Sequence, residues 1–118
     1  MDEKKKERYI ESLKRAVADF ISHTSNRGSL ITVTDVTLSK KEKRVYINIS
    51  VYPESEEERA LAFLKRNISE AREYIGKHVR IGFLPTITFQ IDEGEKARRA
   101  FDEVLAKQKG GASETDAV

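Results

Sequence analysis

The first apolar pattern along the chain has the spacing of a helix. Within residues 3–22 the apolar side chains recur every three or four positions, at Ile10, Leu13, Val17 and Phe20. This spacing places them along one face, as in a surface helix that packs one side against a core. The turn-forming residues 25–28 then end the pattern. We therefore predict a first helix over residues 3–22.

Three later segments alternate apolar and polar residues as strands do. Residues 45–51 and 86–91 alternate cleanly, so each predicts a strand with one buried face. Residues 31–38 alternate with one interruption, because Asp35 stands where an apolar residue is expected and Val36 restarts the pattern. One extra residue in a strand has this effect, so we expect a β-bulge there. The short polar connection between the first two strands predicts a hairpin.

Helical spacing returns between the second and third strands and again after the third. The apolar stripe of the first of these segments is Leu61, Leu64, Ile68, Ala71 and Ile75. It predicts one long helix, or two helices joined by a kink. Ser55 and Glu58 have the spacing of a capping box at a helix start, and Asp92 and Glu95 repeat that spacing. The apolar stripe of the terminal helix is Ala97, Phe101 and Val104.

The order helix, strand, strand, kinked helix, strand, helix predicts an α+β fold. Cleanly alternating strands bury one face, so we expect a three-stranded sheet with its helices on one face. The chain has 118 residues, which suits a single domain. We predict that this domain spans residues 1–108 and includes the terminal helix. Residues 109–118 are small and polar, so we expect a disordered tail.

Composition narrows the class of protein. The chain has no cysteine, which excludes disulfides and thiolate metal sites and fits a reducing compartment. It begins without the apolar segment of a signal peptide. No apolar run approaches the roughly 20 residues that a membrane helix needs. We therefore expect a soluble cytoplasmic protein with no membrane partner.

The charges are partly segregated, although the net charge is only +2. Residues 53–60 contain four glutamates against one arginine, whereas residues 61–80 contain five lysines and arginines against two glutamates. A protein with one binding face for an anionic partner needs such a separation. An ordinary charged surface can have the same pattern, so charge alone does not decide between the two.

Residue types that carry enzyme chemistry form no recognisable motif. The two histidines, His23 and His78, stand outside any catalytic or metal-binding spacing. Gly76-Lys77 is not a phosphate-binding P-loop, because the upstream glycine and the following serine or threonine are missing. The glutamates of residues 54–58 suit a helix N-terminus, where the dipole favours negative charge, better than a metal site. We therefore expect no catalysis, no cofactor and no bound metal.

The element order and residues 72–92 together resemble the ribosome-binding factor A family. The positions that match, in the order typical of the family, are Arg72, Gly76-Lys77, Arg80, Pro85, Phe89 and Asp92. The segment from Thr32 to Ser39 also resembles the opening strand of the family. No single motif is specific, but their ordered combination is. The resemblance extends over nearly the whole predicted domain.

The resemblance implies a type II KH fold, in which two helices and the turn between them form an RNA-binding edge. It also implies a role in late maturation of the small ribosomal subunit, including rRNA processing and cold adaptation. The implied partners are that subunit and its rRNA. In the family an Ala-x-Gly kink replaces the usual KH loop, and its place here is Asn67-Ile68-Ser69. Neither Asn67 nor Ser69 matches, although asparagine accepts a turn conformation and serine can cap the next helix.

Our leading hypothesis is RNA binding with little sequence selectivity, by cations and backbone N–H groups around this bend. The residues assigned to it at or near the bend are Lys65, Arg66, Asn67, Ser69, Arg72, Lys77 and Arg80. The N-terminal residues that extend the footprint are Lys4, Lys5, Lys6 and Arg8. The hypothesis requires the cations on both sides of the bend to converge on one RNA groove.

The alternative is a protein-interaction module of the same fold, whose open sheet face or edge docks a partner. Its contacts would include Tyr46 and Tyr52, which are otherwise half-buried residues of the sheet. Nonspecific single-strand binding ranks lower, because it favours aromatic platforms and the chain has no tryptophan. We expect a monomer.

Overall fold

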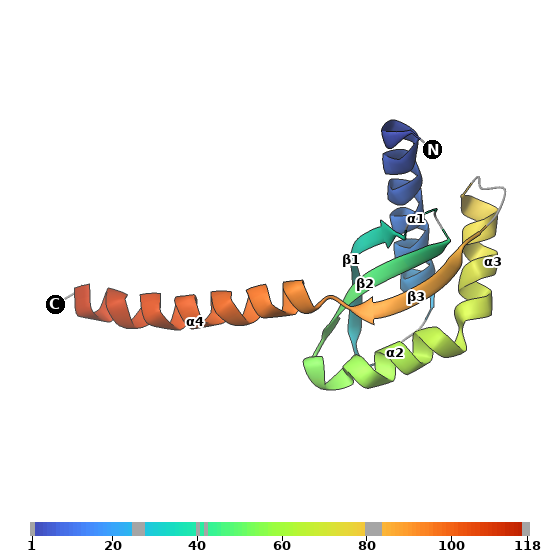
Figure 1. Cartoon of the computed structure of the whole chain (residues 1–118). Coiled ribbons are helices and arrows are strands. Elements are labelled where there is room, and N and C mark those ends of the chain that lie inside the picture. Colours follow the sequence, from blue (N-terminus) through green and yellow to red (C-terminus); the bar gives the residue numbers. More distant parts are fainter. Residues whose placement is uncertain (1, 25–27, 40, 42, 80–83, 117–118) are drawn as a thin grey trace.

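The structure is a computed structural model that describes residues 2–24, 28–39, 41, 43–79 and 84–116. The described part contains four α-helices and one three-stranded sheet (Figure 1). In chain order the elements are α1 (Glu3–His23), β1 (Leu30–Leu38), β2 (Arg44–Tyr52), the 3₁₀ turn η2 (Glu54–Glu56), α2 (Glu57–Arg66), α3 (Ile68–His78), β3 (Thr86–Ile91) and α4 (Glu93–Asp116). The α+β order predicted from the sequence is confirmed.

The sheet is mixed, with β2 in the middle. β1 pairs with β2 in the antiparallel direction, and β3 pairs with β2 in the parallel direction. The predicted bulge is confirmed, because the register of β1 against β2 shifts between Val33 and Asp35. The extra residue returns Val36 to the buried face, where it is 2% exposed, and leaves Asp35 exposed.

The alternating side chains of β2 form the centre of the core. Its fully buried residues are Val45, Ile47, Ile49 and Val51. Burying one such aliphatic side chain contributes about 1.5–3 kcal/mol relative to leaving it exposed. Buried residues of α1, α2 and α3 belong to the same core cluster, so these helices cover one face of the sheet (Figure 1). The predicted one-sided arrangement is confirmed.

The chain bends sharply between α2 and α3, so this stretch is two helices rather than one. Asn67 stands between them with a φ of −104° and a ψ of 20°, outside helical geometry. Its backbone N–H donates to the carbonyl of Phe63 at 3.1 Å, and its side-chain Nδ2 donates to the same carbonyl at 2.8 Å. Because asparagine readily leaves helical geometry and bonds to nearby backbone, it suits this position.

The two predicted capping pairs have different outcomes. Ser55 and Glu58 do not form a capping box: α2 begins at Glu57 with no side-chain cap, because the preceding residues form the 3₁₀ turn. Asp92 caps α4 as predicted, since its carboxylate accepts the N–H of Glu95 at 3.0 Å. The backbone N–H of Asp92 is already used by β2, where it donates to the carbonyl of Ile49 at 2.8 Å.

Helix α4 projects away from the rest of the molecule (Figure 1). The radius of gyration is therefore 17.9 Å, against about 13.5 Å for a compact chain of this length. A salt bridge of 3.0 Å between Lys96 and Glu57 ties its first turns to α2. Beyond that contact Phe101 and Val104 are 61% and 53% exposed, so the terminal stripe lies unpacked.

Helix α4 continues through Asp116, past the point where the sequence predicts a disordered tail. A helix satisfies its own backbone hydrogen bonds locally, and adding residues to an existing helix requires no new nucleus. Disorder of residues 109–118 in solution stays a prediction. None of the helices within the described ranges is both long and apolar enough to cross a membrane.

Candidate nucleic-acid interface

The bend between α2 and α3 has two exposed cations at its rim. Lys65 and Arg66 form the last turn of α2, and both residues are exposed. Neither forms an ion pair with another described residue. The C-terminal end of a helix favours positive charge, so their position on α2 is electrostatically favourable. Both are therefore available to an anionic partner.

A hollow of about 200 Å³ lies beside this rim, between the bend and β3. Its lining residues are Lys65, Ile68, Ile87, Thr88 and Phe89. Three of its five lining residues are apolar, and Lys65 is the one charged residue among them. Such a surface can pack against an unstacked base while the cation meets the adjoining phosphate. The bend and the edge strand β3 thus enclose a small hollow beside the exposed cations of α2.

The first turn of α3 adds backbone N–H groups to the rim. No side chain caps this N-terminus, which begins at Ile68 and Ser69. Uncapped N–H groups at a helix start attract anions. Glu70 is exposed in the same turn, and its negative charge would repel a phosphate there. The N–H of Asn67 is occupied by Phe63, so Asn67 shapes the bend rather than offering a donor.

Arg72 is directed toward the protein backbone. Its Nη1 donates to the carbonyl of Pro85 at 2.8 Å, and its Nη2 donates to the carbonyl of Leu84 at 3.2 Å. Arg72 is half-buried, and these two carbonyls lead directly into β3. Because backbone carbonyls away from water need donors, Arg72 fastens the start of β3 to α3. A contact between Arg72 and RNA stays a prediction.

The remaining cation of α3 lies far from the bend. Lys77 lies ten residues after Asn67, a distance of about 15 Å along a helix. It is exposed, and its Nζ lies 3.3 Å from a carboxylate oxygen of Glu73. Arg80 falls outside the described residues.

The N-terminal cations occupy the first turns of α1, where Asp2 caps the helix by accepting the N–H of Lys5 at 2.8 Å. The ring of Phe20, near the other end of α1, lies 5.9 Å from the ring of Tyr74 on α3. Lys4 is therefore about 24 Å further along α1 than the contact with α3. The members of this group are Lys4, Lys5, Lys6 and Arg8.

The cations chosen from the sequence therefore lie in separate places. The structure brings Lys65 and Arg66 together beside the bend. It leaves Lys77 at the end of α3 and the N-terminal group at the start of α1. The chosen cations that the structure describes are therefore not all gathered beside the bend.

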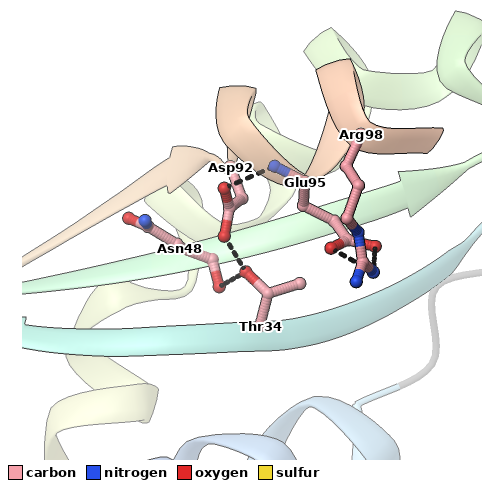
Figure 2. A network of polar contacts seen from close by, with 5 residues as sticks. All are labelled: Thr34, Asn48, Asp92, Glu95 and Arg98. Carbon is pink, nitrogen blue, oxygen red and sulfur yellow. Dashed lines mark hydrogen bonds and ion pairs between the residues drawn. The ribbon is translucent and has the colours of Figure 1, made fainter. Parts of the chain in front are cut away.

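A polar network that sequence reasoning missed joins the sheet to α4 (Figure 2). Asp92 accepts hydrogen bonds from the hydroxyl of Thr34 at 2.5 Å and from the N–H of Glu95 at 3.0 Å. The Thr34 hydroxyl also lies 3.2 Å from the carbonyl of Asn48, and Glu95 pairs with Arg98 at 2.8 Å. Donation by Thr34 and then by Glu95 lowers the pKa of the Asp92 carboxyl. The capping spacing signals the bond to Glu95, but no sequence pattern signals the one to Thr34.

Known proteins share both the sequence and the fold. A family model described as ribosome-binding factor A matches residues 5–105. Ribosome-binding factor A of Acetivibrio thermocellus is 30% identical over 119 aligned residues, which cover 93% of this chain and 96% of the relative.

One crystal structure and one fitted model give the same result. The crystal structure of ribosome-binding factor A from Thermus thermophilus is 30% identical, with a TM-score of 0.64, over 70% of this chain and 89% of its own. A homology model of the Thermus factor, fitted into a cryo-EM map of a 30S complex, is 30% identical with a TM-score of 0.61, over 69% and 88%. These neighbours have the KH-like fold, so the predicted fold class is confirmed. With the family model matching nearly the whole folded region, the chain belongs to the ribosome-binding factor A family.

Proposed function

We propose that this protein binds the small ribosomal subunit through its rRNA and assists the late maturation of that subunit. The proposal extends to rRNA processing and to growth in the cold. The observation that carries it is the family match over residues 5–105. A homology model of the Thermus factor, fitted into the map of a 30S complex, supports the choice of partner. The protein acts as a cytoplasmic monomer in this proposal.

The bend supplies the chemistry for such binding. Lys65 and Arg66 meet phosphates, the hollow between Ile68 and Phe89 receives an unstacked base, and the N-terminus of α3 adds N–H donors. Phosphate contacts dominate, so sequence selectivity is low. No bond is made or broken in this mechanism. The protein favours one rRNA conformation because it binds that conformation better than the alternatives.

Co-sedimentation with purified small subunits tests the proposal. We expect the protein to pellet with the subunits at low salt and to be released as salt rises. The slope of log affinity against log salt should be about −0.7 for each single-strand phosphate neutralised. Failure to pellet with immature and mature subunits at low salt would contradict the proposal.

The alternative function is docking of a protein on the open sheet face. One observation favours it: Leu30 and Tyr52 lie opposite each other in the β1–β2 ladder and are 66% and 69% exposed. Two large exposed side chains side by side can anchor a protein partner. The half-buried Tyr46 lies on the same face. Association that persists at high salt and is lost in Tyr52→Ala would favour this alternative.

A further inference from the structure

The two histidines of the chain meet at one tyrosine. His23 ends α1 and His78 ends α3, 55 positions later in the sequence. The ring of His78 stacks on Tyr74 with centroids 4.0 Å apart and planes 18° apart. The ring of His23 lies 6.4 Å from the same tyrosine, at an angle of 34°. The fold thus gathers three flat rings on the surface where α1 meets α3.

Each histidine ring is held in place by the backbone. Nδ1 of His23 lies 2.7 Å from the carbonyl of Asp19, and Nδ1 of His78 lies 2.8 Å from the carbonyl of Tyr74. A carbonyl oxygen can only accept, so Nδ1 carries the proton in both rings. In the neutral rings Nε2 is then left as an acceptor. The buried ring of Phe20 packs against Tyr74, with the ring centroids 5.9 Å apart, and restricts the motion of the tyrosine ring.

The rings are accessible as well as fixed. Both histidines are exposed and Tyr74 is half-buried. Tyr74 follows Ile68 by six residues, which places it about a third of a turn away from the hollow around the α3 axis. The three rings are therefore separate from the groove at the bend. Lys77 precedes His78 in the sequence and carries an exposed ammonium group, which forms an ion pair with Glu73.

A stacked pair four residues apart on a helix would need no ligand to explain it, since such pairs stabilise helices modestly. Two exposed histidine rings and a half-buried tyrosine, drawn from two helices and already in position, offer more than that pair does. Unpaired bases stack on tyrosine and histidine rings in many RNA-binding proteins, and each stack requires a flat face that is already in position. We propose that the platform of His23, Tyr74 and His78 binds an unpaired RNA base. This inference rests on the proposed function, because it names the part of the rRNA that this second surface takes.

Base stacking and phosphate binding respond differently to changes in the ligand. Stacking needs the base and depends little on salt, whereas phosphate contacts need the charged backbone and weaken as salt rises. A histidine Nε2 that acts as an acceptor can also receive a base amino group or a ribose 2′-OH. Comparing RNA with an oligomer that lacks bases therefore distinguishes binding at the platform from binding by the cations at the bend.

The experiment compares two probes of about twelve nucleotides, a length within the range of single-strand binding sites. One is single-stranded RNA, and the other is a ribose-phosphate oligomer of equal length without bases. For His78→Ala and Tyr74→Leu we expect affinity for the RNA to fall about 5- to 150-fold, with affinity for the abasic oligomer unchanged. His78→Phe keeps a flat ring and should retain the preference for RNA. The matched control is Phe101→Ala, which removes an exposed aromatic ring from the projecting helix α4 and should leave both affinities unchanged.

Each other outcome overturns the inference in a recognisable way. Unchanged RNA affinity in both variants would show that the platform receives no base, while leaving the proposed function intact. Equal loss for both probes, with His78→Phe no better than His78→Ala, would assign these rings to folding alone. If the unaltered protein binds neither probe nor small subunits, the proposed function fails together with the inference.

Discussion

Thr34 and Asp92 lie 58 residues apart in the sequence, yet the Thr34 hydroxyl donates a 2.5 Å hydrogen bond to the Asp92 carboxylate (Figure 2). Thr34 stands at the bulge of β1, and Asp92 caps α4. One carboxylate therefore serves both the sheet and the start of the projecting helix. The bulge has a structural role here, because it presents the Thr34 side chain to the end of β3.

Replacing Thr34 by valine should destabilise the protein by about 1–3 kcal/mol at pH 7, because a hydrogen bond to a charged group is lost while the shape is kept. The pKa of Asp92 is lowered from its ordinary value of 3.8 in the folded state. The associated stability is therefore present above pH 3.8 and is lost as the pH falls below it. The difference in free energy of unfolding between Thr34→Val and the unaltered protein should therefore become smaller in acid. Urea unfolding at neutral and acidic pH measures it.

The control for this prediction is Thr32→Val, at an exposed position of the same strand. We expect that change to alter the free energy of unfolding by less than about 0.5 kcal/mol. If the difference in free energy of unfolding between Thr34→Val and the unaltered protein stayed constant as the pH fell below 3.8, the hydrogen bond to the Asp92 carboxylate would not be its cause.

Arg72→Ala should lower stability rather than act mainly on RNA binding. It removes two donors from the carbonyls of Leu84 and Pro85, at an expected cost of about 1–3 kcal/mol. Arg72→Lys should recover only part of this, because an ammonium group cannot reproduce the planar fork of a guanidinium. Thermal or urea unfolding measures both. The control is Arg59→Ala on α2, whose side chain is 77% exposed, with an expected change below about 0.5 kcal/mol. An Arg72→Ala protein as stable as the control would refute the structural role.

Periodicity predicted the parts of the fold that depend on which face a side chain occupies. The alternation at 45–51 identified the four fully buried residues of β2, and the change of phase at Asp35 identified the bulge. These features follow from the two-residue repeat of a strand, which is visible in one segment alone. The sequence did not decide between one long helix and two helices joined by a kink, because the apolar stripe continues past Asn67 without a break.

The site was harder to predict because its contacts join segments remote in sequence. A basic residue in a helix gives no sign of whether it faces RNA or a carbonyl twelve residues later, as Arg72 does with Leu84. The terminal stripe at Phe101 shows an amphipathic helix but not a partner for it. The two histidines matched no motif, since the surface that they share is created by the packing of α1 against α3.

The double change Lys65→Ala with Arg66→Ala should weaken binding to small subunits and make it less sensitive to salt. If each cation neutralises one phosphate, the slope of log affinity against log salt should become shallower by about 1.4. Stability should change little, because both side chains are exposed. Sedimentation at several salt concentrations provides the slope.

A control of equal charge tests whether the position of these cations matters. Arg59→Ala with Lys107→Ala also removes two exposed positive charges, one from the opposite part of α2 and one from α4. We expect a smaller effect on both affinity and slope. Equal effects of the two double variants would mean that net charge, not the bend, governs binding.

Helix α4 beyond its first turns should contribute almost nothing to the stability of the domain. Phe101 and Val104 are mostly exposed, and a helix without tertiary packing is marginal in water. Deleting residues 109–118, or changing Phe101 to serine, should alter the free energy of unfolding by less than about 0.5 kcal/mol. By contrast Ile75→Ala, in the core, should cost about 2–5 kcal/mol. Amide hydrogen exchange should be fast beyond Phe101 and slow in β2. Protection of α4 as strong as that of β2 would mean that its apolar stripe packs against a surface in solution, and the tail would then not be disordered.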